Sequence, residues 1–179
     1  MAAMANADDL LPILITPHPA LRRKARPVAP GDAAAVRALA ARMLAAMYAA
    51  PGIGLAAPQV GVDLRLVVVD LMPGERPDPV VLVNPRVVAA SEELATREEG
   101  CLSVPGQYAD VARPARVTVR YHDLDGVARQ READGLLAAC LQHELDHLDG
   151  VLFVDHLTPL KRNILLRRLA KERKIKAAG

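Results

Sequence analysis

Two histidines spaced four residues apart, His143 and His147, are the side chains of this sequence best suited to chemistry. In a helix, one turn separates such a pair, so both imidazoles lie on one face and can bind a single metal ion. Glu144 follows His143 directly, where its carboxylate can exchange a proton with a metal-bound water. The pattern therefore favours a metal-dependent hydrolase with Glu144 as its general acid/base.

The residues around this pattern predict a buried helix over Leu136 to Leu148, with Asp134 as its N-cap and Gly150 beyond its end. The segment is apolar nearly all round, which is typical of a helix in the middle of a protein. Two histidines and a glutamate are costly to bury there without partners. The alternative is a pair of ordinary histidines that hydrogen bonds satisfy.

A catalytic metal site usually has three protein ligands and an open position, so a third ligand is required. Metzincins place a third histidine where this chain has Phe153, which excludes that source. Glu172 lies downstream, but its lysine and arginine neighbours explain it more simply. We expect the remaining histidines at the surface: His18, His122 and His156.

Cys101 is the candidate that remains. Gly100 precedes it and permits close approach of the backbone to a ligand. One thiolate and two imidazoles with an open fourth position suit a borderline divalent ion. The alternative is a buried, inert cysteine, which is the better description of Cys140.

The segment GIGLAAPQ (52–59) formally matches a dinucleotide-binding fingerprint, but a helix precedes it and Pro58 follows where a helix should begin. We interpret it as a loop that brings backbone close to a substrate, with Gln59 as a placed amide.

The elements that must position these residues favour an α+β fold. Asp32 is the expected N-cap of a helix to about Ala50. Residues 64–71 and 80–83 read as strands, and Arg116–His122 alternates as one strand of a hairpin with 127–133. Thr158 and Pro159 begin a basic helix over about 158–176. We expect one domain over 1–179, with antiparallel β-sheets packed around the central metal-binding helix and a C-terminal helix.

Composition narrows the class further. The chain has one Phe, three Tyr and no Trp, so we expect an aliphatic core, and the scarcity of aromatic residues argues against a base-stacking nucleic-acid module. Residues 1–9 lack a basic region and the apolar run 10–15 is short, so we expect no signal peptide, no membrane span and a cytoplasmic location. In that reducing compartment we expect Cys101 and Cys140 to be thiols or ligands and not a disulfide. Eight basic residues and one acidic residue fall between Lys161 and Lys176.

Three segments together, GIGLAAPQ (52–59), EGCLSVP (99–105) and QHELDHLDG (142–150), resemble the signature segments of the peptide deformylase family. The resemblance implies removal of the formyl group from N-formylmethionine of nascent chains, with release of formate. It implies Cys101, His143 and His147 as ligands of Fe(II), with Zn, Ni or Co as substitutes. Metal-bound water would attack the formyl carbonyl, helped by Glu144.

The same resemblance implies further roles. The Gln59 side chain and the Leu102 backbone N–H would stabilise the oxyanion. The peptide would lie as an added strand against Ile53-Gly54 and Glu99-Gly100. Three helix residues would line the methionine pocket, unless they only pack in the core: Leu136, Ala139 and Cys140.

The chain departs from the family in ways that concern the pocket. Ala139 is smaller than expected, Arg97 stands where an apolar residue is common, and Tyr108 stands where a basic one is frequent. The basic C-terminal helix is either a solvated face or, as the resemblance suggests, a contact with ribosomal RNA phosphates.

Other functions stay open from the residues alone. One is an H-E-x-x-H metallopeptidase that cleaves internal peptide bonds. Another is a thiol hydrolase with Cys101 as nucleophile. A purely structural metal module needs a fourth protein ligand, for which the sequence offers no candidate. The sequence argues against a serine triad, because Ser91 and Ser103 are the only serines and neither lies in a G-x-S-x-G turn.

Overall fold

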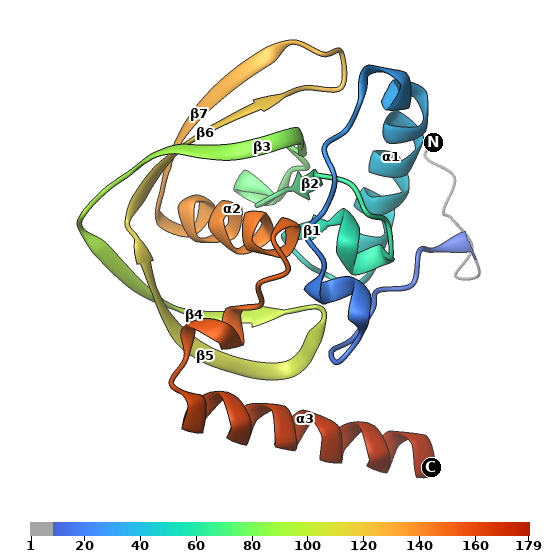
Figure 1. Cartoon of the computed structure of the whole chain (residues 1–179), viewed down its shortest axis with the longest axis vertical. Helices are drawn as coiled ribbons and strands as arrows, with labels where there is room; N and C mark the ends of the chain where they lie inside the picture. Colours follow the sequence, from blue (N-terminus) through green and yellow to red (C-terminus); the bar gives the residue numbers. More distant parts are fainter. Residues whose placement is uncertain (1–8) are drawn as a thin grey trace.

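Two antiparallel sheets flank one central helix in the computed structural model of this chain, which describes residues 9–179 (Figure 1). The expectation about a leader over residues 1–9 lies almost wholly outside the described residues. The helices and strands follow in the order α1 (Ala33–Ala49), β1 (Gly54–Ala56), β2 (Leu66–Val69), β3 (Val80–Ala90), β4 (Leu94–Cys101), β5 (Val104–Pro114), β6 (Arg116–His122), β7 (Ala128–Asp134), α2 (Gly135–Leu148) and α3 (Pro159–Ala178).

The larger sheet has five strands in the order β1-β2-β3-β6-β7, and the smaller sheet pairs β4 with β5. All pairings between these strands are antiparallel. Helix α2 lies between the two sheets (Figure 1). The predicted α+β class, with antiparallel sheets around a central helix and with a C-terminal helix, is confirmed.

The predicted hairpin forms over β6 and β7, with Arg116 paired to Asp134 and His122 to Ala128. Val117 and Val119 face the core, as the alternation predicts. Gly126 turns the chain with φ +78°, a conformation that glycine adopts without steric cost.

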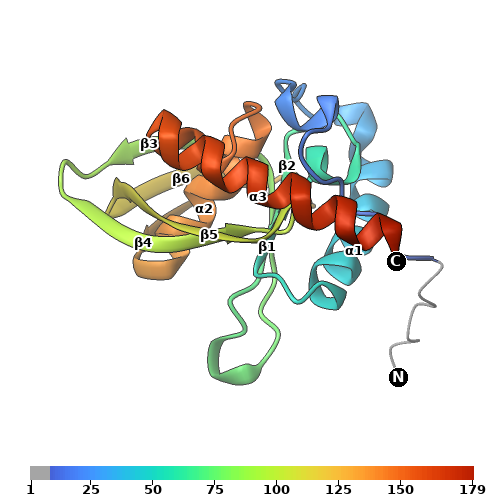
Figure 2. The same ribbon diagram turned by 90° about the horizontal axis from the view of Figure 1, so that it is seen from below.

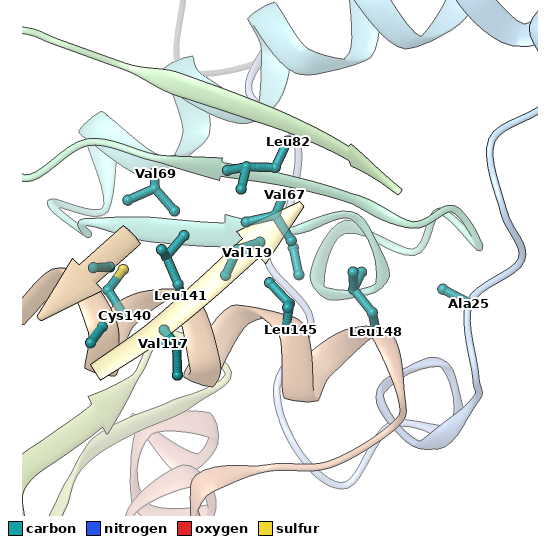
Figure 3. Close-up of a cluster of buried hydrophobic side chains, with 13 residues drawn as sticks. Ala25, Val67, Val69, Leu82, Val117, Val119, Cys140, Leu141, Leu145 and Leu148 are labelled. Carbon is teal, nitrogen blue, oxygen red and sulfur yellow. The ribbon is translucent and has the colours of Figure 1, made fainter. Parts of the chain in front are cut away.

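The core around α2 is aliphatic, as composition predicts. Leu141, Leu145 and Leu148 of α2 pack against Val67 and Leu82 of the larger sheet (Figure 3). Burying one such leucine stabilises the fold by about 2 kcal/mol, so this face of α2 is firmly held. The side chains on its other face are then presented at fixed positions.

Asp32 and Asp134 are the N-cap residues of α1 and α2, as predicted, but neither side chain makes the expected capping hydrogen bond. Asp32 precedes α1, but it has helical φ and ψ and its carboxylate accepts from the backbone N–H of Ala29 instead. Asp134 precedes α2, but its side chain makes no capping bond. Gly135, the first residue of α2, has φ +53°, so the chain turns sharply where the helix begins.

Several strand predictions need correction. The strand expected over 64–71 is only Leu66–Val69, and the strand expected over 80–83 continues to Ala90. The GIGLAAPQ segment is not a loop throughout, because Gly54–Ala56 forms β1 and the next four residues form a 3₁₀ turn. Strands β4 and β5 were not expected, since polar residues interrupt their apolar pattern.

Helix α3 lies across the β4–β5 sheet (Figure 2). Thr158 caps it as predicted, with Oγ1 accepting from the backbone N–H of Lys161 at 3.3 Å. Leu165 and Leu169 anchor the helix to a small core around Phe153. Within the described part of the chain, none of the helices is both long and apolar enough to pass through a bilayer.

Candidate metal centre

Helix α2 and the end of β4 bring the three expected ligands together. His143 and His147 are buried on one face of α2, with their ring centroids 5.1 Å apart. Cys101 is the last residue of β4, where the register with β5 shifts after Gly100. Its Sγ lies 3.3 Å from Nε2 of His147, and one ligand atom from each of the three residues lies within 4.8 Å of the others.

These distances fit a divalent ion. Tetrahedral bonds of about 2.3 Å to sulfur and 2.0–2.1 Å to nitrogen place such ligand atoms about 3.5 Å apart, close to the separation of Cys101 and His147. Across residues 9–179, no fourth His, Cys, Asp or Glu joins the group. A three-ligand set leaves a coordination position open, as catalytic sites require.

Glu99 fixes the ring of His143. Its Oε1 lies 2.9 Å from Nδ1 of His143. Because a carboxylate only accepts, Nδ1 donates and Nε2 is left as the ligand nitrogen. Burial opposes ionisation of Glu99, but hydrogen bonds from His143 and Arg113 outweigh it and lower its pKa to about 2.

The second histidine lies deeper. Burial holds the pKa of His147 well below its usual range, which favours the neutral imidazole that metals bind. The ring of Phe153 stacks beside His143, with centroids 6.1 Å apart. The position of the metzincin histidine is therefore an apolar wall of the site.

Glu144 is buried beside the ligands, and its Oε2 has no hydrogen-bond partner among the described residues. Burial raises its pKa to about 7. The side chain fits only because residue 54 is glycine, since a Cβ there would lie 2.7 Å from Oε1 of Glu144. The carboxylate is thus placed and tuned to accept and return a proton near neutral pH.

Gln59 is held rigidly at the same site. Its Oε1 accepts from the backbone N–H of Ala56 at 2.9 Å, and its Nε2 donates to Oγ of Ser103 at 3.1 Å. The same nitrogen lies 3.7 Å from Sγ of Cys101. The amide is therefore oriented toward the ligand set, as the interpretation of a placed amide requires.

A cavity of about 460 Å³ opens onto this site. It is lined by every residue expected to bind the peptide, namely Ile53, Gly54, Glu99, Gly100, Leu136, Ala139 and Cys140. Gln59, Leu102 and Glu144 also line it, as do Arg97 and Tyr108. The structure thus gathers three distant segments around one pocket.

Sequence reasoning missed several residues that support the site. Ser103 holds Gln59, and Arg113 binds Glu99 through Nε and Nη2 at 2.7 and 3.0 Å. Arg113 could have been found from its spacing, because it lies two residues after the buried Val111 on β5 and so faces the same side of the strand.

The other candidate ligands lie outside the site. His18, His122 and His156 are exposed as predicted. Glu172 accepts from Nε2 of Gln107 at 3.0 Å and is not part of the Cys101, His143 and His147 group.

A thiolate and two imidazoles beside a buried carboxylate, at the wall of a cavity of about 460 Å³, are the groups of a metallohydrolase. Residues 10–163 match the family model for polypeptide deformylase. The chain is 52% identical over 168 residues to the peptide deformylase of Rhizobium meliloti, covering 93% of this chain and 96% of that one. This chain belongs to the polypeptide deformylase family.

Solved structures agree. A peptide deformylase from Legionella pneumophila superposes with a TM-score of 0.88 at 45% identity, covering 95% of this chain and 99% of that one. A peptide deformylase from Synechococcus elongatus in complex with actinonin gives 0.85 at 44% identity, covering 91% and 89%. The family implies a divalent metal, and the Cys101, His143 and His147 group provides a place for it.

Proposed function

We propose that this chain removes the formyl group from N-formylmethionine of newly made polypeptides and releases formate. The observation that carries the proposal is the placement of Glu144. One oxygen of its buried carboxylate has no hydrogen-bond partner within residues 9–179, and the side chain lines the cavity beside Cys101, His143 and His147. Family membership gives the substrate class, and the site supplies groups for each part of the reaction.

Cys101, His143 and His147 would hold one divalent ion, which when bound supplies a Lewis acid that acidifies water and polarises a carbonyl. Glu144 takes the proton from water as a C–O bond forms at the formyl carbon. It then gives that proton to the leaving amine as the C–N bond breaks, which yields formate and a free N-terminus.

Two donors are assigned to the charge that develops on the formyl oxygen. The first is Nε2 of Gln59, whose orientation is fixed by Ala56 and Ser103. The second is the backbone N–H of Leu102, next to Cys101 in the cavity wall. Preorganised donors of this kind typically contribute about 3–4 kcal/mol each to catalysis.

The substrate backbone is assigned to the space between β1 and β4. Strand β1 is at the edge of the five-stranded sheet and β4 has a free edge in the two-stranded sheet. Gly54 of β1 and the preceding Ile53 line the cavity on one side, and Glu99 and Gly100 of β4 line it on the other. An extended peptide can therefore add as a strand, with its first side chain among Leu136, Ala139 and Cys140.

The test is formate release from a formyl-Met tripeptide, with the unformylated and N-acetyl tripeptides as comparisons. We expect release only from the formylated peptide, and a loss of roughly 10²- to 10⁴-fold in Glu144→Gln. Glu132→Gln, on the exposed face of β7, serves as the control. Cleavage of internal bonds in the unformylated peptide would instead indicate the metallopeptidase.

We propose Fe(II) as the native ion, with Zn, Ni or Co as substitutes, because a thiolate and two imidazoles accept several borderline metals. Metal analysis of anaerobically purified protein checks this. Removal of the metal should abolish activity and its return should restore it. Activity that survived complete removal would favour the thiol hydrolase with Cys101 as nucleophile.

We also propose that α3 contacts the ribosome through RNA phosphates, which places the protein in the cytoplasm where nascent chains are made. Arg167, Arg168 and Lys171 are exposed on α3, and the basic charge of the chain is concentrated there. Replacing these three with Gln should weaken co-sedimentation with ribosomes at low salt. Unchanged co-sedimentation would leave α3 as a solvated face.

A further inference from the structure

A chain of charged side chains connects the metal-site histidine to the protein surface. It begins at His143, which donates from Nδ1 to Glu99. Arg113 donates to both oxygens of Glu99, and its Nη1 donates to Oδ2 of Asp146 at 2.8 Å. Nε2 of His156 lies 2.8 Å from the same oxygen of Asp146. Four elements thus meet along one continuous series of hydrogen bonds.

The inner members of this series have little freedom. The side chains of Arg113 and Glu99 are 7% and 8% exposed, and that of Asp146 is 27% exposed. Rotation of Glu99 would break its contacts with His143 and with both nitrogens of Arg113. Such bidentate, charge-assisted contacts fix geometry as well as add free energy. The orientation of His143 therefore depends on where the guanidinium of Arg113 is held.

We propose that Asp146 is a positioning residue for the metal site, which it affects through Arg113 and Glu99. Asp146 holds Nη1 of Arg113, and this contact sets the plane of the guanidinium that binds Glu99. His156 stabilises the outer end of the series. The inference rests on the proposed metal site. We expect Asp146 to affect the orientation of His143 as a ligand and not the binding of substrate. The reason is that the main cavity is not lined by Arg113, Asp146 or His156.

Charge balance explains why an aspartate is needed at position 146. Arg113 is a buried cation between two carboxylates, and an unpaired buried charge is strongly disfavoured. Without the negative charge of Asp146, the guanidinium is free to turn and Glu99 is less firmly oriented. Loss of a group that directly orients a metal ligand typically costs 10- to 100-fold in metal affinity. Asp146 acts one step further out, so we expect a loss of roughly 3- to 10-fold.

The experiment is a titration of the metal-free full chain with Co(II), followed by the thiolate-to-cobalt absorption band. Asp146→Asn is compared with Asp149→Asn as a matched control. Asp149 lies at the same end of α2 and also pairs with an arginine, Arg65, at 2.9 Å, but it has no link to His143. We expect weaker Co(II) binding only in Asp146→Asn, with KM for the formylated peptide unchanged in both variants.

A double-mutant cycle with Glu99→Gln tests the route. If Asp146 acts through Glu99, then Asp146→Asn should have less than a twofold effect in the Glu99→Gln background. The same 3- to 10-fold loss in both backgrounds would overturn the proposal. So would Co(II) affinities in Asp146→Asn and Asp149→Asn that agree within experimental error.

Arg113→Lys provides a second variant if Asp146→Asn does not fold. Lysine keeps the charge but loses the planar fork, so we expect roughly tenfold weaker Co(II) binding. Wild-type affinity in this variant would overturn the proposal. Failure of the wild-type chain itself to bind Co(II) would overturn the proposed metal site, and the positioning role with it. The two failures are therefore distinguishable.

Discussion

Gly54 should be irreplaceable because of its distance from Glu144. In Gly54→Ala, the added Cβ would lie 2.7 Å from Oε1 and 2.8 Å from Cγ of Glu144, and 3.0 Å from Sγ of Cys140. Carbon atoms in contact normally lie about 3.5–4.0 Å apart, so the glutamate has to move by roughly 0.7–1 Å. A misplacement of about 1 Å at a reacting group can cost about 10² in rate.

We therefore expect kcat of Gly54→Ala to fall roughly 30- to 100-fold, while Co(II) affinity stays unchanged because the three atoms nearest the new methyl group belong to Glu144 and Cys140 and not to a metal ligand. The assay is formate release under saturating formyl-Met tripeptide, with melting temperature as a check on folding. Gly31→Ala is the matched control, because nothing lies within 4 Å of its Cβ. A kcat for Gly54→Ala within threefold of Gly31→Ala would refute the steric argument.

Three further substitutions test other parts of the structure. Burial opposes ionisation of Asp70, but hydrogen bonds from the Tyr48 hydroxyl and two backbone N–H groups lower its pKa below 3.8. Asp70→Asn should therefore lower the free energy of unfolding by about 2 kcal/mol at pH 7. In urea unfolding experiments, the difference between wild type and variant should shrink as the pH falls below 3.8, because Asp70 then becomes protonated in the wild type. A difference that stayed constant with pH would contradict this. Thr158→Ala removes the cap to Lys161 and should cost about 1 kcal/mol in the same assay, whereas no loss would mean that the cap is unimportant. Ala139→Ile narrows the cavity and should lower kcat/KM for formyl-Met peptides roughly tenfold, while kcat/KM for a formyl-Ala peptide should stay unchanged. Equal losses on both peptides would mean that the side chain of the first substrate residue binds elsewhere.

The helix that carries the site could be predicted from sequence because its signals are local. The spacing of His143 and His147 and the apolar positions around them define both the helix and its buried face. Gln59 could be identified as a placed amide from its segment alone. Cys101 could only be reached by elimination, since its approach to His147 depends on a register shift between β4 and β5.

The support of the site could not be predicted because it depends on pairing between distant segments. Arg113 and Asp146 are 33 residues apart and each looks like a surface residue when read alone. Strand β4 was missed because Arg97, Glu98 and Glu99 hide its pattern. The absence of side-chain capping bonds at Asp32 and Asp134 could not be predicted either. The carboxylate of Asp32 accepts from Ala29 and pairs with Arg26, and Gly135 begins α2 with a positive φ.

The register shift that presents Cys101 has a consequence for the lifetime of the protein. Cys101 is at the end of a two-stranded hairpin with its own small core, whereas both histidines belong to α2. A lone hairpin is only marginally stable. A metal ion bound by Cys101 of the β4–β5 hairpin and by the two histidines of α2 would therefore also tie the hairpin to the rest of the domain. Free metal at 100 times its dissociation constant would add about 2.7 kcal/mol to global stability. We therefore expect metal starvation to lower the cellular abundance of the protein through faster proteolysis, in addition to lowering the activity of each molecule.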